Sequence, residues 1–218
     1  CDSPLLQQQL AALRDWTERE LQRLAPVFED RAQQGFVREC HGDLHAGNIV
    51  CLETGLVPFD CIEFSDELRC IDMMSDVAFL CMDLRYRRRP DLAAVFLNRY
   101  LECTGDYPGL AVLAFYLVYR AVVRAKVAGV RYRQHGSPAD AASIADHLAL
   151  ALQITQAAER PLLVICHGLS GSGKTWLSDQ LIAALPALRL RSDLVRKQQA
   201  GLAELQRSGS GLRETHQL

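Results

Sequence analysis

The spacing of apolar residues along most of the chain predicts a bundle of helices. In residues 4–24 leucines and a tryptophan recur every three or four positions, which is the period of a helix with one apolar face. Similar patterns predict helices over 72–87 and 90–103, the second beginning at a proline. Residues 110–130 are apolar almost all round and predict a helix buried among the others. A last helix of this group is expected over 138–157.

Short apolar runs between these helices predict strands. Residues 35–40, GFVREC, are expected to form a short strand that leads into a polar loop. The runs 49–52 and 56–59 flank a turn that contains glycine and therefore predict a hairpin. A further short strand is expected over 59–64, directly after the hairpin. This part of the chain is thus expected to be a helical domain with small sheets, in the α+β class.

The pattern of apolar residues changes near residue 158, where the helical spacing ends. Residues 162–166 are a continuous apolar run, which is typical of a buried parallel strand. A glycine-rich loop, a helix over 176–185 and a second strand over 188–190 are expected to follow. We therefore expect two parts, residues 1–157 and the beginning of an α/β domain in residues 158–218.

Composition and charge exclude several classes of protein. The chain has 24 Lys and Arg against 26 Asp and Glu, and 49% of its residues are apolar, as in ordinary globular proteins. A net charge of -2 gives no electrostatic footprint for nucleic acid, and no apolar run reaches the length of about 20 residues that a membrane span needs. The eight cysteines show no C-x-x-C spacing, which predicts reduced thiols and a cytoplasmic location. The oligomeric state is left open.

The glycine-rich loop at residues 168–175, GLSGSGKT, matches the pattern G-x-x-x-x-G-K-[ST] between an expected strand and an expected helix. Its glycines allow backbone N–H groups to surround phosphates, and the helix N-terminus adds partial positive charge. Lys174 is expected to reach the β- and γ-phosphates of ATP, and the Thr175 hydroxyl to bind Mg²⁺. The residues expected to hold the nucleotide are Gly168, Ser170, Gly171, Ser172, Gly173, Lys174 and Thr175.

Asp193 is a weaker candidate on the acceptor side of this loop. It follows the strand expected over 188–190, where a carboxylate either orients Mg²⁺ or deprotonates an acceptor hydroxyl. The pair Ser192-Asp193 is equally typical of a helix N-cap.

A second constellation lies in the first part of the chain. Residues 41–48 contain H-x-D-x-x-x-x-N, which is the spacing of a kinase catalytic loop. In that interpretation Asp43 accepts the proton of a substrate hydroxyl, while Asn48 and Asp60 hold Mg²⁺ from neighbouring strand ends. The alternative is a polar loop with a capping aspartate.

Neighbouring residues are expected to support this loop. His41 is expected to pack beneath it as a structural residue, because the spacing of the nearby Cys and His residues fits no zinc pattern. Either Asp72 or Asp76 is expected to brace the loop by accepting hydrogen bonds from its backbone N–H groups.

These motifs resemble those of known kinases. Residues 41–50, HGDLHAGNIV, followed by Phe59-Asp60, resemble the aminoglycoside phosphotransferase group of small-molecule kinases. The run 59–84, with Arg99-Tyr100 and the helix at 120–126, resembles more closely a bacterial family of bifunctional aminoglycoside phosphotransferase/ATP-binding proteins. GLSGSGKT and RSDLVRK are similar to gluconate-kinase-like and polynucleotide-kinase-like P-loop kinases. The resemblance covers about residues 36–200, and its two parts come in the same order.

The resemblance implies a kinase-like C-lobe in residues 1–157, followed by the first part of a P-loop kinase domain in residues 158–218. It implies ATP and Mg²⁺ as cofactors and a small-molecule hydroxyl as acceptor. No lobe with a nucleotide-binding loop and a Lys–Glu pair precedes residue 36, and no second acidic strand or arginine-bearing lid follows the P-loop. We therefore expect a piece truncated at both ends, which would be inactive by itself.

Two other functions are compatible with the sequence. One is a nucleotide-binding regulatory or sensor protein that transfers no phosphoryl group. The other is a P-loop ATPase with no acceptor. The presence of Asp43, Asn48 and Asp60 together favours the phosphotransferase, because a degenerate kinase need not keep all three.

Overall fold

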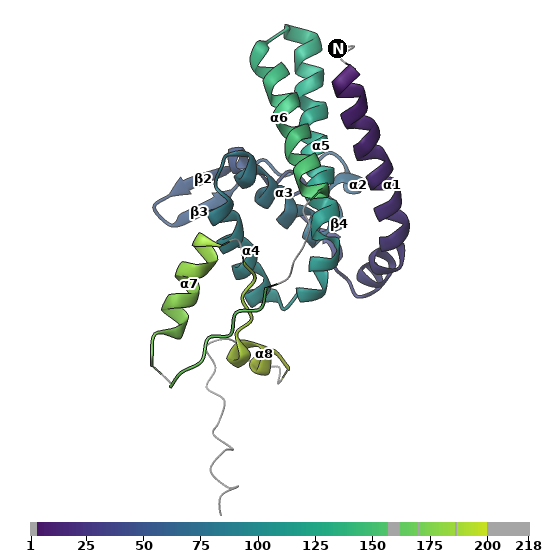
Figure 1. Cartoon of the computed structure of the whole chain (residues 1–218). Helices are drawn as coiled ribbons and strands as arrows, with labels where there is room; N and C mark the ends of the chain where they lie inside the picture. Colours follow the sequence, from purple (N-terminus) through teal and green to yellow (C-terminus); the bar gives the residue numbers. More distant parts are fainter. Residues whose placement is uncertain (1–3, 157–161, 170, 186, 200–218) are drawn as a thin grey trace, which may run out of the picture.

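The computed structural model describes residues 4–156, 162–169, 171–185 and 187–199 (Figure 1). Its fold is mixed α+β and rich in helix, as the sequence predicts. The described helices are α1 (Pro4–Gln33), α2 (Asp66–Arg69), α3 (Met73–Tyr86), α4 (Pro90–Thr104), α5 (Leu110–His135), α6 (Pro138–Thr155), α7 (Lys174–Ala184) and α8 (Ser192–Gln199). Among them, none combines the length and apolarity that a membrane crossing requires.

The described strands form two small antiparallel sheets. Strand β1 (Val37–Glu39) pairs with β4 (Cys70–Asp72), and β2 (Ile49–Leu52) pairs with β3 (Gly55–Pro58). The strand predicted over 35–40 and the hairpin are therefore confirmed. The polar loop 40–48 connects the two sheets, so both of its ends are fixed.

The predicted helices of the first part are confirmed, but two of them run further than their apolar pattern indicates. α1 continues through Pro26 to Gln33, where Phe28 packs its ring at 5.3 Å from that of Phe115 in α5. α5 continues to His135 and ends at Gly136, whose φ of 65° is the left-handed geometry typical of a helix end. Contacts between distant helices thus extend the elements beyond what local spacing predicts.

The core surrounds α3, in which every residue from Met74 to Asp83 is buried. α4 and α5 pack against α3, and α6 packs along α5. α1 contacts both α5 and α6, so these three form the upright bundle seen in Figure 1. α3 therefore lies at the centre of the first part, and its Asp76 and Asp83 side chains both contact the loop 40–48.

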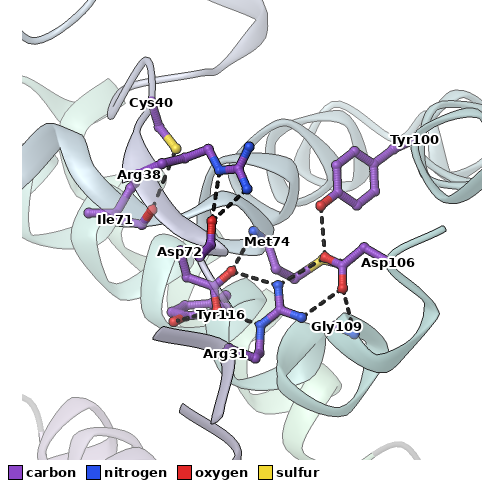
Figure 2. Close-up of polar contacts among 11 residues, drawn as sticks. Arg31, Arg38, Cys40, Ile71, Asp72, Met74, Tyr100, Asp106, Gly109 and Tyr116 are labelled. Carbon is purple, nitrogen blue, oxygen red and sulfur yellow. Dashed lines mark hydrogen bonds and ion pairs between the residues drawn. The ribbon is translucent and has the colours of Figure 1, made fainter. Parts of the chain in front are cut away.

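A buried ion cluster joins α1 to the start of α3 (Figure 2). The Arg31 guanidinium donates to both carboxylate oxygens of Asp72, at 2.7 and 2.8 Å, and to both of Asp106, at 2.7 and 2.9 Å. Tyr100 donates its hydroxyl to Asp106 at 2.8 Å. Burial acts to lower the pKa of Arg31, but the hydrogen bonds with Asp72 and Asp106 outweigh it and raise that pKa. The arginine is therefore a permanently charged link between three distant segments.

The strands predicted over 162–166 and 188–190 are wrong. Residues 162–166 have no strand structure, and their apolar side chains are exposed. A strand needs a neighbour to pair its N–H and C=O groups, and the described part of the chain places none beside either segment. Residues 188–190 are instead attached to α4, where the Asn98 side chain bonds the Ala187 carbonyl and the Arg189 N–H, and Glu102 binds the Arg189 guanidinium at 2.7 Å.

The strand predicted over 59–64 is also wrong. β3 ends at Pro58, and Asp60 has a φ of 59°, a left-handed conformation that cannot continue a strand. Aspartate tolerates this conformation better than most residues. The segment instead turns back toward the loop 40–48, where the Ile62 N–H donates to the His41 carbonyl at 2.9 Å.

Candidate active site

The loop 40–48 is clamped by backbone contacts. The Cys40 N–H donates to the Arg69 carbonyl of α2 at 2.8 Å. Gly42 has a φ of 81°, and a Cβ atom at this position would lie 2.8 Å from the Leu68 carbonyl oxygen. Only glycine combines that conformation with so close an approach. The loop therefore has one defined path between α2 and the segment that follows the hairpin.

Buried side chains of α3 brace the loop from below. The Asp76 carboxylate accepts the backbone N–H groups of His41 at 2.8 Å and Gly42 at 3.1 Å, which confirms Asp76 as the brace. Asp72 has another role, since it accepts the Met74 N–H at 2.9 Å as the N-cap of α3 and binds Arg31.

Two further braces were missed from the sequence. The Ala46 N–H donates to the Asp83 carboxylate at 3.0 Å, and Arg120 of α5 donates to the Gly42 carbonyl at 3.0 Å. Asp83 lies two helical turns after Asp76 with only apolar residues between them, and Arg120 is a single charge in an apolar stretch. Charges at such buried positions need partners, and that was the available signal.

The structure brings Asp43 and Asn48 together, as their spacing predicts. The Asn48 amide Nδ2 donates to the Asp43 carbonyl at 3.1 Å and to its carboxylate at 3.2 Å. Asn48 is buried, whereas 39% of the Asp43 side chain is exposed. Because Nδ2 is engaged with Asp43, Oδ1 is the amide atom left to bind a cation. The carboxylate is thus held in place and is reachable from solvent.

His45 adjusts the electrostatics of Asp43. Its Nδ1 accepts the Gly47 N–H at 3.0 Å, and its Nε2 lies 3.5 Å from the Asp43 carboxylate and 3.4 Å from Arg124 Nη1. The hydrogen bond from His45 lowers the pKa of Asp43; burial opposes this, and the charge of Arg124 adds to the lowering. Asp43 is therefore ionised at neutral pH, as a proton acceptor must be.

His41 links the loop to the segment that carries Asp60. Its Nδ1 accepts the Asp43 N–H at 3.4 Å, and its Nε2 donates to the Phe59 carbonyl at 2.8 Å. The Phe59 N–H in turn donates to the Asn48 carbonyl at 2.9 Å. The structural role predicted for His41 is confirmed, and the exposed residue Asp60 directly follows the residue bonded to Asn48.

Asn48 and Asp60 are the candidate ligands for a magnesium ion, and no larger group of His, Cys, Asp or Glu side chains that could hold a metal occurs among the described residues. The Asn48 amide oxygen and the Asp60 carboxylate are hard oxygen donors, which Mg²⁺ prefers. Mg²⁺ commonly takes only one or two protein carboxylates and completes its shell with water and substrate phosphates. Two protein ligands, Asn48 and Asp60, with the partly exposed Asp43 carboxylate in the same loop as Asn48, are compatible with that coordination.

Two glycines of the glycine-rich loop have left-handed backbone conformations. Gly171 and Gly173 have φ values of 79° and 80°, and α7 begins at Lys174 directly after them. The Lys174 ammonium donates to the carbonyls of Gly168 at 2.8 Å and Leu169 at 2.6 Å. Thr175 is exposed in the first turn of α7. Ser170 lies outside the described residues.

Asp193 has its described side-chain partner outside this loop. It is in the first turn of α8 and pairs with Arg191 at 3.1 Å. Partial burial acts to raise the pKa of Asp193, but the bond with Arg191 outweighs it and lowers that pKa. Within the described residues no hydrogen bond or ion pair joins Asp193 to the loop 168–175.

Comparison with known proteins agrees with this arrangement. Residues 2–116 match the phosphotransferase enzyme family, and residues 163–217 match the AAA domain family. The chain belongs to the phosphotransferase enzyme family, and a P-loop kinase-like domain follows, in the order of the bifunctional arrangement. Together the two families support a phosphotransferase or kinase-like activity with nucleotide binding.

Relatives of the chain occur in mycobacteria. Uncharacterized proteins of Mycobacterium bovis and Mycobacterium tuberculosis are 39% identical to it over 171 residues. The match covers 78% of this chain and 34% of each relative, so the chain spans about a third of their length. No solved structure gives a significant match.

Proposed function

We propose that the protein is an ATP-dependent phosphotransferase that acts on a hydroxyl group of a small molecule. Asp43 is the base, and Asn48 and Asp60 hold Mg²⁺. One observation carries this proposal. The Asn48 Nδ2 atom donates to the Asp43 carboxylate at 3.2 Å, and the loop that holds both residues is braced by buried carboxylates of α3.

The reaction needs little from the protein beyond positioning and charge. The acceptor oxygen attacks the γ-phosphorus of ATP, the bond from that phosphorus to the β,γ-bridging oxygen breaks, and the hydroxyl proton passes to the Asp43 carboxylate. The products are a phosphate monoester and ADP. Mg²⁺ supplies positive charge to the transferring phosphoryl group. Asn48 orients Asp43, because its amide bonds both the backbone and the carboxylate of that residue.

A second ATP site is proposed at the loop 168–175. The positive φ values of its glycines and the start of α7 at Lys174 support phosphate binding by backbone N–H groups. Lys174 and Thr175 are the residues proposed to contact the phosphates and Mg²⁺. Asp193 stays a proposed acceptor-side residue, and its ion pair with Arg191 does not favour that role over a structural one.

Radiolabelled ATP tests where the chemistry occurs. The full-length gene product is incubated with γ-labelled ATP and Mg²⁺ against a panel of aminoglycosides, sugars, nucleosides and simple alcohols. Label transfer that is lost in Asp43→Ala and retained in Lys174→Ala supports the proposal. Loss in Lys174→Ala alone places the chemistry in the second part. ATP binding without transfer to any acceptor favours the sensor, and phosphate release independent of acceptor favours the ATPase.

His45→Ala is expected to move the acid limb of the pH–rate profile to higher pH. Asp43 acts when ionised, so its rate contribution is lost as the pH falls through its pKa. The His45 hydrogen bond is the largest cause of the lowered pKa, and burial opposes it. Removing His45 therefore raises the pKa of Asp43. The measurement is kcat against pH, with His135→Ala at the exposed end of α5 as the control. An unchanged acid limb in His45→Ala would contradict this account.

A further inference from the structure

A cavity of about 580 Å³ lies beside Asp43. Its lining includes five aromatic rings, those of Phe28 in α1, of Phe79 in α3, and of Phe115, Tyr116 and Tyr119 in α5. Phe115 lies edge-on to Phe28 and Tyr116, with ring centres 5.3 and 5.8 Å apart. Pockets of about 300–1,000 Å³ are typical of sites for small organic molecules. The cavity therefore has the size of a substrate site and borders the proposed base.

The charged groups in the wall of this cavity are largely engaged within the protein. Asp72 binds Arg31, and Arg120 donates to the Gly42 carbonyl at 3.0 Å. The carboxylates that remain for a bound molecule are Asp43 and Glu67, and Glu67 lies on the exposed surface of α2. The cavity therefore offers one carboxylate close to the proposed reaction centre and one at the surface.

Apolar side chains line the cavity while remaining open to solvent. The exposed fractions are 51% for Leu21, 42% for Val37, 47% for Leu68 and 46% for Tyr119. These residues come from four separate elements, α1, β1, α2 and α5. Apolar surface that gathers around a hollow in this way is typical of a ligand site.

We propose that this cavity binds the acceptor, and that the acceptor is a hydroxyl group on an aromatic or branched aliphatic body. The inference rests on the proposed function. A polyol or polyamine placed here would lose its hydrogen bonds to water and would find few replacements in the apolar wall. A single hydroxyl needs only one polar partner, and Asp43 supplies it. The phosphoryl group then passes to that hydroxyl, Asp43 takes the proton, and ADP leaves.

Binding of a model acceptor tests the proposal without requiring turnover. Naphthylmethanol is titrated into the full-length gene product by calorimetry, beside kanamycin as a polycationic control. We expect naphthylmethanol to bind and kanamycin not to. Tyr119→Ser is expected to weaken naphthylmethanol at least about tenfold, because it removes an aromatic wall, whereas Tyr119→Phe retains the affinity. Tyr132→Ser, on the same helix but outside the cavity, is expected to leave the affinity unchanged.

The outcomes separate this inference from the function on which it rests. Binding of naphthylmethanol that depends on Tyr119, with no transfer of phosphate to any alcohol, leaves the apolar pocket standing and overturns the phosphotransferase. Phosphate transfer to kanamycin or a sugar that requires Asp43, with no binding of naphthylmethanol, supports the phosphotransferase and overturns the apolar acceptor. Equal affinity of naphthylmethanol for the protein and its Tyr119→Ser variant also overturns the assignment of the cavity.

Discussion

Replacing Arg31 by methionine is expected to lower the free energy of unfolding by about 3–5 kcal/mol. Arg31 is 3% exposed and is the cation between Asp72 and Asp106. Without it, two buried carboxylates face the same space with no compensating charge, and the link between α1, β4 and the segment before α5 is lost. Equilibrium denaturation followed by circular dichroism measures the change.

Two further variants test whether the loss of stability comes from the buried ion cluster and not from the loss of any arginine in α1. Arg23→Met removes an arginine from the exposed side of the same helix, where it pairs with Glu20, and is expected to cost at most about 1 kcal/mol. Arg31→Lys keeps the charge but not the forked geometry that binds both carboxylates, and should fall between the two. Equal stability of Arg31→Met and Arg23→Met would show that the buried cluster does not hold the fold together.

Asp43→Asn is expected to lower kcat by about 10²–10⁴-fold, which is the range for loss of a positioned general base. The amide occupies nearly the same volume and the Asn48 bond to the residue 43 carbonyl can persist, so the fold is expected to be kept. The substitution removes proton acceptance together with the negative charge of residue 43. Steady-state kinetics with the acceptor found by label transfer give the measurement.

Asp91→Asn is the matched control for this substitution. Asp91 also has a lowered pKa, caused first by its hydrogen bond with Arg89, but it lies at the start of α4 away from the loop 40–48. Its variant is expected to retain full turnover. An Asp43→Asn variant as active as Asp91→Asn would exclude Asp43 as the base.

The parts of the site that sequence analysis predicted are those with local causes. Asp43 and Asn48 lie five residues apart in one loop, so their spacing alone brings them together. Among the braces with distant loop partners, Asp76, 35 residues from His41, was one of two candidates, whereas Asp83 and Arg120, 37 and 78 residues from their partners, were missed because no local pattern pairs them with the loop. The cavity was missed for the same reason, since its wall is assembled from several distant elements.

In the fold, too, the elements that depend on local sequence were predicted, and the features that depend on distant contacts were not. The helices of the first part follow from their apolar period, and the hairpin follows from its turn. The strand predicted over 162–166 failed because an apolar run shows that a segment can be buried but not what would cover it. The predicted end of α1 was too early. The last turns of the helix pack through Phe28 against Phe115 of α5, a contact that the local pattern does not show.

We propose that Asn48 and Asp60 hold the metal of a nucleotide site separate from the P-loop. Mn²⁺, used in place of Mg²⁺ and followed by electron paramagnetic resonance, tests this in the full-length Lys174→Ala background with ATP present. We predict that Mn²⁺ and ATP still bind together there, and that adding Asp60→Asn weakens Mn²⁺ affinity by about 10–100-fold. Binding that disappears with Lys174→Ala alone, or that is unaffected by Asp60→Asn, would contradict the account.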